Sequence, residues 1–360
     1  METKNSAMRL REIDALRGLA AAAVVVEHSY GIRGEFPGSA FRWAVGESFG
    51  VPLFFAASAY CLYTAMDSHG TCSKQVVAFY VRRLFRIAPL FYSVLALYLG
   101  GLYVGRGIPI PWGQVAGTIS FTFNFVEGGQ SSLVWAGWTI GIEMAFYVVF
   151  PLIYLLIKEM RAALLLVVIA IGITEIAYAV TPHLAYDPKA FWNLSIFRYL
   201  TTFAAGVVAY HLMPIIRKDC RWGLAALLAA AIATAFWKAG PYGDNRLYGV
   251  AVAAGSALVG ICLCPLKTLV NRATLFLGRI SYSLYLVHPP IIYYSLWMQE
   301  YIHALSIPEW IRFALAAILC LFLSLPVAVL VHHAIEKPCN NFGRRVANRL
   351  AGRHIAEVPA

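Results

Sequence analysis

The chain has 360 residues, of which 60% are hydrophobic and only 13% are charged, and its mean hydropathy is +0.67. Soluble domains are about 45–50% apolar and about 25% charged, so this composition excludes an ordinary soluble enzyme and predicts a multi-pass membrane protein. The formal net charge of +11 would suit a nucleic-acid-binding protein. The basic residues instead follow the predicted membrane topology, so we expect no nucleic-acid partner.

The first apolar run, at residues 15–31, carries ionisable side chains that a simple membrane anchor would lack. Asp14, Arg17, Glu27 and His28 lie inside this run or at its edges. An ionisable group in hydrocarbon costs roughly 2.5–3.5 kcal/mol on insertion scales, and such groups are usually functional. A cleaved signal peptide is the alternative. However, Asp14 and Arg17 interrupt its pattern, and His28 would lie beyond the cleavage site.

The spacing of these side chains places them on one face of a helix. An α-helix turns about 100° per residue, so Arg17 and His28 differ by only about 20° and lie about 16 Å apart along the axis. Asp14 lies near the same face and is three residues from Arg17, close enough to pair. This stripe predicts a path for an anionic ligand that ends at a reactive imidazole. The alternative is that His28 is a packing histidine bonded to a neighbouring helix.

Ten apolar runs approach the roughly 20 residues that a membrane-spanning helix needs. They lie at residues 15–31, 48–66, 87–104, 139–157, 162–180, 194–213, 222–238, 247–265, 278–299 and 311–334. Residues 113–126 are too short and too polar to be counted, and we interpret them as a re-entrant or interfacial segment.

The distribution of positive charge supports an even number of spans. With the N-terminus in the cytoplasm, 21 of the 29 Lys and Arg residues fall on the cytoplasmic side. We therefore predict an all-α polytopic membrane protein with about ten transmembrane helices and both termini cytoplasmic. A membrane domain is expected over residues 1–345, followed by a basic cytoplasmic tail at residues 346–360. None of the seven cysteines falls in a predicted outer loop, so we expect no disulfide framework.

A basic amphipathic segment at residues 73–89 precedes the third span. Arg82, Arg83 and Arg86 lie within about one and a half turns of it. One interpretation is a surface helix that rests on anionic lipid. The other is a phosphate-binding site, because a guanidinium group forks onto two phosphate oxygens. The two interpretations are compatible.

Glu143 is the second charge predicted to lie deep in the membrane. It follows the outer end of its span by about five residues, or roughly 7.5 Å, while His28 lies about 21 Å above the inner end of its own span. Both groups are therefore expected at similar depth. A neighbouring glutamate would hold the imidazole tautomer and stabilise its charged form. The alternative is a helix–helix hydrogen bond with no chemical role.

The ninth span contains several polar side chains. Tyr285 and His288 are three residues apart, and Pro289 and Pro290 are expected to bend the helix beside them. His288 is therefore either a second site residue or a group that caps the kink.

Seven stretches of this chain together resemble acyltransferase family 3, the integral-membrane O-acyltransferases of surface and exported carbohydrates. They run in family order over nearly the whole chain. They are RxxDxLRGxA at 11–20, the Arg17/His28 pair, GVPLFFAASAY at 50–60, RRLFRI at 82–87, WTIGIE at 138–143, GRISYSLYLVH at 278–288 and IEKP at 335–338.

The resemblance implies acyl transfer, usually of acetyl, from cytoplasmic acyl-CoA to a carbohydrate hydroxyl at the bacterial cytoplasmic (inner) membrane. Acyl-CoA is then a co-substrate, and no bound cofactor or metal is expected. Arg17, Arg83 and Arg86 would bind the donor phosphates. His28 would act as general base or form an acyl-histidine intermediate, and Glu143 would orient it. The remaining residues of the predicted site are supporting ones: Arg11, Asp14, Tyr282, Tyr285 and His288.

Several other mechanisms and functions are alternatives to acyl transfer by a histidine. The sequence has no GxSxG elbow and no metal-ligand cluster, which argues against a serine-hydrolase or zinc mechanism. A transporter or flippase of a glycan or lipid-linked sugar would also line a route with buried charges. A non-enzymatic membrane scaffold is the third alternative.

Overall fold

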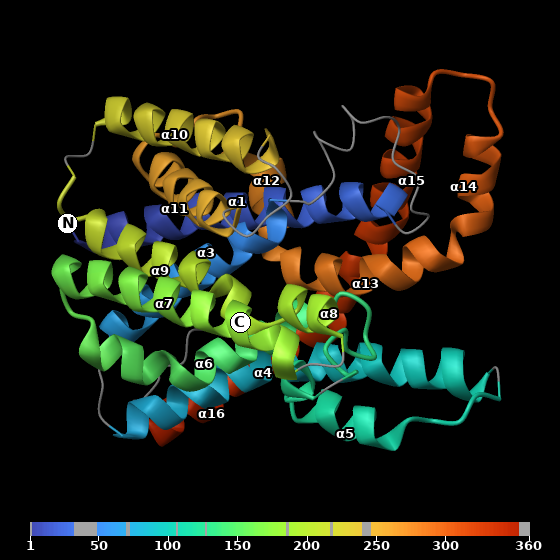
Figure 1. Cartoon of the computed structure of the whole chain (residues 1–360), viewed down its shortest axis with the longest axis horizontal. Helices are drawn as coiled ribbons and strands as arrows, with labels where there is room; N and C mark the ends of the chain where they lie inside the picture. The colour runs from blue at the N-terminus through green and yellow to red at the C-terminus, as the bar shows by residue number, and fades with distance from the viewer. Residues whose placement is uncertain are drawn as a thin grey trace. The chain divides into compact units, whose positions relative to one another are not determined.

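The computed structural model describes residues 2–31, 49–69, 73–105, 107–126, 128–184, 187–216, 219–239 and 246–352, and every regular element in these ranges is a helix (Figure 1). Each of the ten apolar runs overlaps one or more of these helices, so the prediction of an all-α fold is confirmed. In chain order they are α1 (Glu2–Gly31), α3 (Gly50–His69), α4 (Ser73–Tyr98), η1 (Leu99–Val104), α5 (Trp112–Ile119), η2 (Phe123–Phe125), α6 (Trp138–Leu156), α7 (Met160–Leu184), α8 (Pro188–Asn193), α9 (Ile196–Leu212), α10 (Cys220–Ala239), α11 (Arg246–Leu263), α12 (Arg272–Arg279), α13 (Ser281–Tyr294), α14 (Leu296–His303), α15 (Glu309–Val331), η3 (His332–Glu336) and α16 (Lys337–Leu350).

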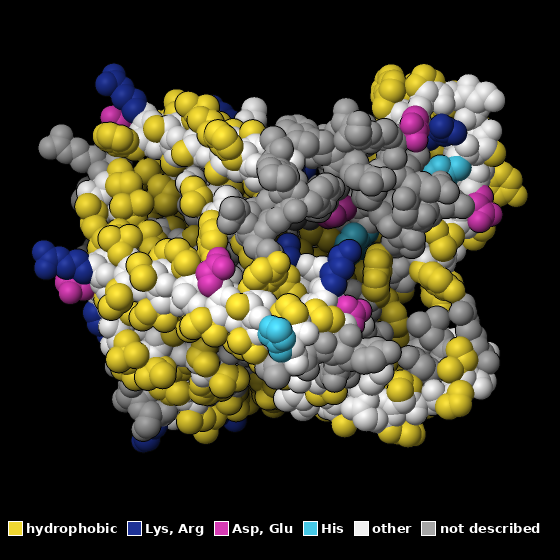
Figure 2. Space-filling view, in the orientation of Figure 1, with side chains coloured by type: hydrophobic (Ala, Val, Ile, Leu, Met, Phe, Trp, Pro, Cys, Tyr) yellow, Lys and Arg dark blue, Asp and Glu magenta, His cyan; other side chains and the backbone are white. Residues whose placement is uncertain are grey.

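Five helical segments among the described residues are long and apolar enough to cross a membrane. Their bounds are Lys74–Gly101, Trp138–Leu156, Met160–His183, Cys220–Lys238 and Glu309–Leu350. Hydrophobic side chains cover the exposed faces of α7 and α10, as expected for helices that face lipid (Figure 2). The chain is therefore a multi-pass membrane protein.

Two predicted boundaries are wrong. The basic segment 73–89 is not a separate surface helix, because α4 runs without a break from Ser73 to Tyr98. It contains no glycine, and Pro89 is accommodated within it, so nothing ends the helix between the arginines and the apolar run. The ninth run, 278–299, is not one helix either. It is divided between α12, α13 and α14, with breaks at Ile280 and Ser295, while α13 continues through both prolines.

The helices divide into two compact units, each described here by itself. Unit 1 comprises residues 1–61, 159–177 and 197–328, and unit 2 comprises residues 62–158, 178–196 and 329–360. In unit 1, α1, α3, α9 and α11 share an apolar core that includes Leu16, Ala56, Tyr60 and Leu258. A Cβ atom at Gly206 would lie 2.2 Å from the Ala56 carbonyl oxygen, so α9 and α3 pack with their backbones almost touching.

In unit 2, the amphipathic α16 packs along α4 (Figure 1). Gly343 allows this approach, because a Cβ atom there would lie 2.3 Å from the Cβ of Phe85. Phe85 also contacts Phe342, with ring centroids 5.4 Å apart. The helix continues to Leu350, five residues beyond the domain boundary expected at residue 345.

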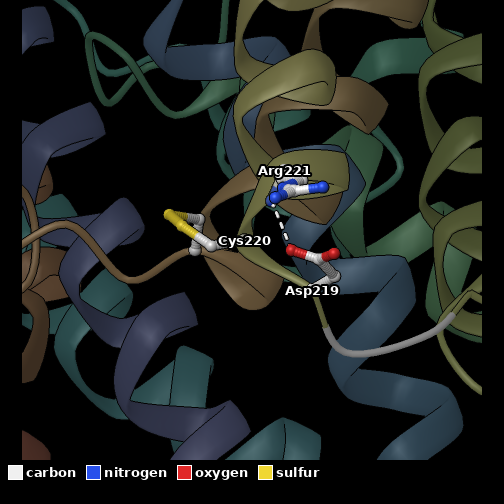
Figure 3. Close-up of a disulfide and its surroundings, with 4 residues drawn as sticks. Asp219, Cys220 and Arg221 are labelled. Carbon is white, nitrogen blue, oxygen red and sulfur yellow. Dashed lines mark hydrogen bonds between the residues drawn. A yellow bond between two sulfur atoms is a disulfide. The ribbon is translucent and has the colours of Figure 1, made fainter.

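The hairpin of α10 and α11 in unit 1 contains a disulfide that the sequence did not predict. Cys220 and Cys264 are joined, with their Cα atoms 4.6 Å apart (Figure 3). The two helices come this close because Gly223 faces Cys264, where a Cβ atom would lie 2.6 Å from the cysteine Cβ. Beside the bond, the Arg221 amide donates to the Asp219 carboxylate and closes the turn that begins α10.

Candidate active site

Two glycines bring together the helices that carry the candidate site in unit 1. Gly18 on α1 faces Gly278 on α12 so closely that a Cβ atom on Gly18 would lie 2.4 Å from the Thr274 carbonyl oxygen. A Cβ atom on Gly278 would lie 2.0 Å from the Asp14 carbonyl oxygen. Only glycine permits this contact between two backbones. It explains why both family-like motifs, at residues 11–20 and 278–288, contain a glycine.

The two histidines follow these glycines at equal spacing. His28 lies ten residues after Gly18, and His288 lies ten residues after Gly278. On α1 this spacing corresponds to about 15 Å at 1.5 Å per residue. On the other segment the chain passes from α12 into α13 at Ile280 between the two residues. Because both pairs meet, the two segments run in the same overall direction.

The two imidazoles form a hydrogen-bonded dyad. Nδ1 of His28 lies 2.8 Å from Nε2 of His288. The ring centroids are 5.1 Å apart and the ring planes differ by only 18°. With nitrogens this close and centroids this far apart, the rings meet edge to edge and nearly in one plane, which aligns a lone pair with an N–H bond. His288 is fully buried, and its Nδ1 lies 3.1 Å from the Leu284 carbonyl oxygen.

A series of ring contacts connects Arg17 with this dyad. The Arg17 guanidinium lies 6.0 Å from the ring centroid of Phe54 on α3. Phe54 meets the edge of Tyr285 at 5.9 Å, and Tyr285 lies 5.7 Å from His288. Arg17 and His28 are thus connected through side chains of α3 and α13. That they share one face of α1 stays a prediction.

The other predicted residues of unit 1 lie around this arrangement. Asp14 presents its carbonyl oxygen to Gly278, and Tyr282 is buried in α13. Arg11 is exposed near the start of α1. Phe54 was missed by sequence reasoning, because nothing in its local pattern distinguishes it from a packing residue.

A second group of predicted residues lies in unit 2, around Tyr147. The Tyr147 hydroxyl donates to the Glu143 carboxylate, and the Arg83 guanidinium lies 5.5 Å from the Tyr147 ring centroid and 5.7 Å from that of Phe79. Arg86 lies three residues after Arg83 on α4 and therefore near the same helix face. The structure thus brings Arg83 and Glu143 to one buried tyrosine. Tyr147 was missed, although it follows Glu143 by four residues and therefore shares its helix face.

Asn124 anchors the segment 113–126 to the helix that carries Glu143. Its side-chain amide donates to the carbonyl oxygens of Trp138 and Leu194, at 3.1 and 3.0 Å. A Cβ atom at Gly141 would lie 1.6 Å from the Asn124 side-chain oxygen, so a larger residue there would displace the Asn124 side chain. Within the segment, α5 and η2 are short helices joined by turns.

The predicted pair of His28 and Glu143 joins residues of different units, and it stays a prediction. Within its own unit, His28 Nδ1 bonds with His288, and Glu143 accepts from Tyr147. His288 contacts His28 and also bonds back to Leu284, and its role in the site stays a prediction.

Sequence comparison defines the class to which this helical architecture belongs. Residues 10–332 match the family model described as "Acyltransferase domain". Fold and sequence thus place the chain in the class of membrane-bound acyltransferases. It belongs to acyltransferase family 3, the family that this domain defines, which confirms the resemblance drawn from its motifs.

Three similar proteins have names that describe a function. The chain is 29% identical over 314 residues to BcsY of Komagataeibacter xylinus, named as a candidate membrane-bound transacylase, covering 78% of this chain and 72% of that one. It is 25% identical to YrhL of Bacillus subtilis, named as a candidate peptidoglycan O-acetyltransferase, over 94% of this chain and 56% of the relative. It is 23% identical to the peptidoglycan O-acetyltransferase OatA of Listeria monocytogenes, over 81% of this chain and 50% of the relative.

The chain therefore spans about half the length of the two peptidoglycan O-acetyltransferase relatives. No solved structure matches it.

Proposed function

We propose that this protein transfers an acyl group, most simply acetyl, from cytoplasmic acyl-CoA to a hydroxyl group of a cell-surface or exported carbohydrate. The observation that carries the proposal is the arrangement in unit 1. There, the Arg17 guanidinium lies beside Phe54, and Phe54 contacts Tyr285. Tyr285 in turn contacts His288, the hydrogen-bond partner of His28. An acyl-CoA has the matching form, with phosphates at one end and a thioester at the other.

His28 acts as the general base. Its Nε2 accepts the proton of the acceptor hydroxyl while the hydroxyl oxygen attacks the thioester carbonyl carbon. The resulting tetrahedral intermediate expels the thiolate, which takes the proton back from the imidazolium. The products are the O-acyl ester and the free thiol of CoA. In the alternative mechanism, Nε2 attacks the thioester itself and forms an acyl-histidine that the acceptor then resolves.

The names of the relatives support this reaction class. Two are named for peptidoglycan O-acetylation and one for transacylation, so a glycan acceptor is proposed without a specific sugar. We further propose ten spans in the bacterial inner membrane with both termini in the cytoplasm, where acyl-CoA is available. Arg83 and Arg86 are proposed to bind phosphate, and Glu143 is proposed to take part in catalysis.

The decisive experiment measures transfer from labelled acetyl-CoA to glycan by purified protein in proteoliposomes. His28→Ala should abolish transfer, while the variant still inserts into the membrane and unfolds at the temperature of the wild type. His183→Ala is the control, because this histidine is exposed on α7. Full transfer by His28→Ala would overturn the catalytic assignment, and glycan movement without acylation would support a transporter instead.

A further inference from the structure

The hydrogen bonds of His288 determine which nitrogen of His28 carries a proton. Nδ1 of His288 faces the Leu284 carbonyl oxygen at 3.1 Å, and a carbonyl oxygen only accepts, so this nitrogen must carry hydrogen. His288 has no exposed surface. A charged imidazolium is costly in such a position, so the ring is neutral and its Nε2 holds a lone pair.

The proton between the two rings then belongs to His28. Nε2 of His288 accepts, so Nδ1 of His28 donates across the 2.8 Å contact. A neutral His28 with hydrogen on Nδ1 has its lone pair on Nε2, the nitrogen that points away from the dyad. We infer that His288, held by the Leu284 carbonyl, is a positioning residue that keeps His28 in the tautomer whose Nε2 is basic and nucleophilic.

This inference rests on the proposed function, because it states which nitrogen of the proposed base carries a proton before the reaction. When Nε2 takes the proton of the acceptor hydroxyl, His28 becomes an imidazolium that still donates from Nδ1 to His288. No second proton moves, and the proton on Nε2 later goes to the leaving thiolate. The same tautomer is required if Nε2 forms an acyl-histidine, so the inference applies to both mechanisms.

His288 resembles the orienting member of a catalytic triad in its role, but it is neutral. An aspartate in that position fixes the tautomer and also stabilises the positive charge. Asparagine in its place holds the wrong tautomer and lowers kcat by about 10⁴-fold. Loss of His288 leaves the tautomer of His28 unfixed but does not impose the wrong one, so we expect kcat to fall by a smaller factor, on the order of 10²-fold.

The direct test is nitrogen-15 solid-state NMR of histidine-labelled wild-type protein in lipid, which distinguishes the two neutral tautomers. The His28 signals are identified by their loss in His28→Ala. His28 should be protonated on Nδ1 and His288 on Nδ1. A His28 ring protonated on Nε2 in the wild type would overturn the inference without any variant of His288.

Two substitutions at residue 288 then separate the tautomer from simple cavity filling. His288→Leu fills a similar volume but accepts no hydrogen bond, so His28 should populate both tautomers and its ring should no longer be held in one orientation. Together these losses should lower kcat about 100-fold. The KM for acetyl-CoA should change less than threefold, because Arg17 is untouched. His288→Gln offers a carbonyl oxygen near the position of Nε2 and should recover at least tenfold of the lost kcat. His183→Leu, at an exposed histidine, controls for the chemical change.

The outcomes separate the two proposals. If His28→Ala is inactive but His288→Leu has wild-type kcat and an unchanged His28 tautomer, the positioning role is wrong while the proposed function stands. If His288→Gln and His288→Leu are equally impaired with His28 still protonated on Nδ1 in both, His288 acts only through packing. If His28→Ala is fully active, both proposals fail.

Discussion

Arg17 lies at the start of the ring contacts that lead to the dyad, with its guanidinium 6.0 Å from the Phe54 ring centroid. A guanidinium group offers forked donors to a phosphate. Its predicted role is therefore specific to the donor and independent of the acceptor.

Arg17→Ala should raise the KM for acetyl-CoA by about 10- to 100-fold, the value of a charge-assisted hydrogen bond of 1.5–3 kcal/mol, and should leave the KM for the glycan nearly unchanged. Arg17→Lys keeps the charge but loses the fork, so an intermediate KM is expected. Steady-state kinetics with each substrate varied in turn provides the measurement. A donor KM equal to that of the wild type in Arg17→Ala would refute the phosphate role.

Tyr147 connects the charged residues of unit 2 through its hydroxyl, which bonds to Glu143 while its ring lies beside Arg83. Tyr147→Phe keeps the ring and removes the hydroxyl. The Glu143 carboxylate then loses a donor, which should lower the free energy of unfolding by about 1–3 kcal/mol. The melting temperature of the detergent-solubilised protein reports this change.

The control for Tyr147→Phe is Tyr80→Phe. The Tyr80 hydroxyl bonds to the Val148 carbonyl oxygen at 2.8 Å, but at an exposed position where solvent or headgroups can replace it. Tyr80→Phe should therefore lower the melting temperature much less than Tyr147→Phe. Equal decreases in both variants would show that the hydrogen bond to Glu143 stabilises the protein no more than an exposed one does.

At the scale of helices, small residues determine which elements meet. Gly18 and Gly278 bring α1 against α12, Gly206 brings α9 against α3, and Gly343 brings α16 against α4. Hydrophobic burial contributes little to helix association inside lipid, so close backbone approach and the van der Waals contacts it allows become the main source of stability. The first of these contacts lies at the start of the segment that carries His288, so we expect the dyad to depend on it.

Gly278→Ala should therefore lower both stability and activity. The added Cβ would lie 2.0 Å from the Asp14 carbonyl oxygen, which belongs to the backbone and cannot rotate away. Overpacking of this kind typically destabilises a protein by about 1–3 kcal/mol. Gly172→Ala on α7 is the matched control, since a Cβ atom there has no neighbour within 4 Å. Thermal unfolding and acyl-transfer assays on both variants provide the comparison. A Gly278→Ala variant with the melting temperature and activity of the wild type would contradict the glycine contact.

At the scale of the whole molecule, the number of spans decides where the two ends of the chain lie. Ten spans would put both termini on the same side of the membrane, and the distribution of positive charge predicts that this side is the cytoplasmic one. Protease added to intact spheroplasts should then leave epitope tags at residues 1 and 360 untouched and should digest both after the membrane is opened. Digestion of only one tag in intact spheroplasts would require an odd number of spans.

Much of this protein follows from its amino-acid order alone. The apolar runs predict the helices because a helix satisfies its own backbone hydrogen bonds and can therefore cross hydrocarbon. The 11-residue spacing of Arg17 and His28 predicts a shared face because helix geometry is regular. The motif glycines and polar residues indicate the family, which the domain match over residues 10–332 confirms.

The tertiary structure decided which side chains meet. His288 became the partner of His28, and Tyr147 joined Glu143 to Arg83, only once helices distant in sequence were packed together. The same holds for Phe54 beside Arg17 and for the bond between Cys220 and Cys264. Helical periodicity is a local property of the chain, whereas the choice of neighbouring helix depends on steric fit between surfaces hundreds of residues apart, such as the contact of Gly18 with Gly278.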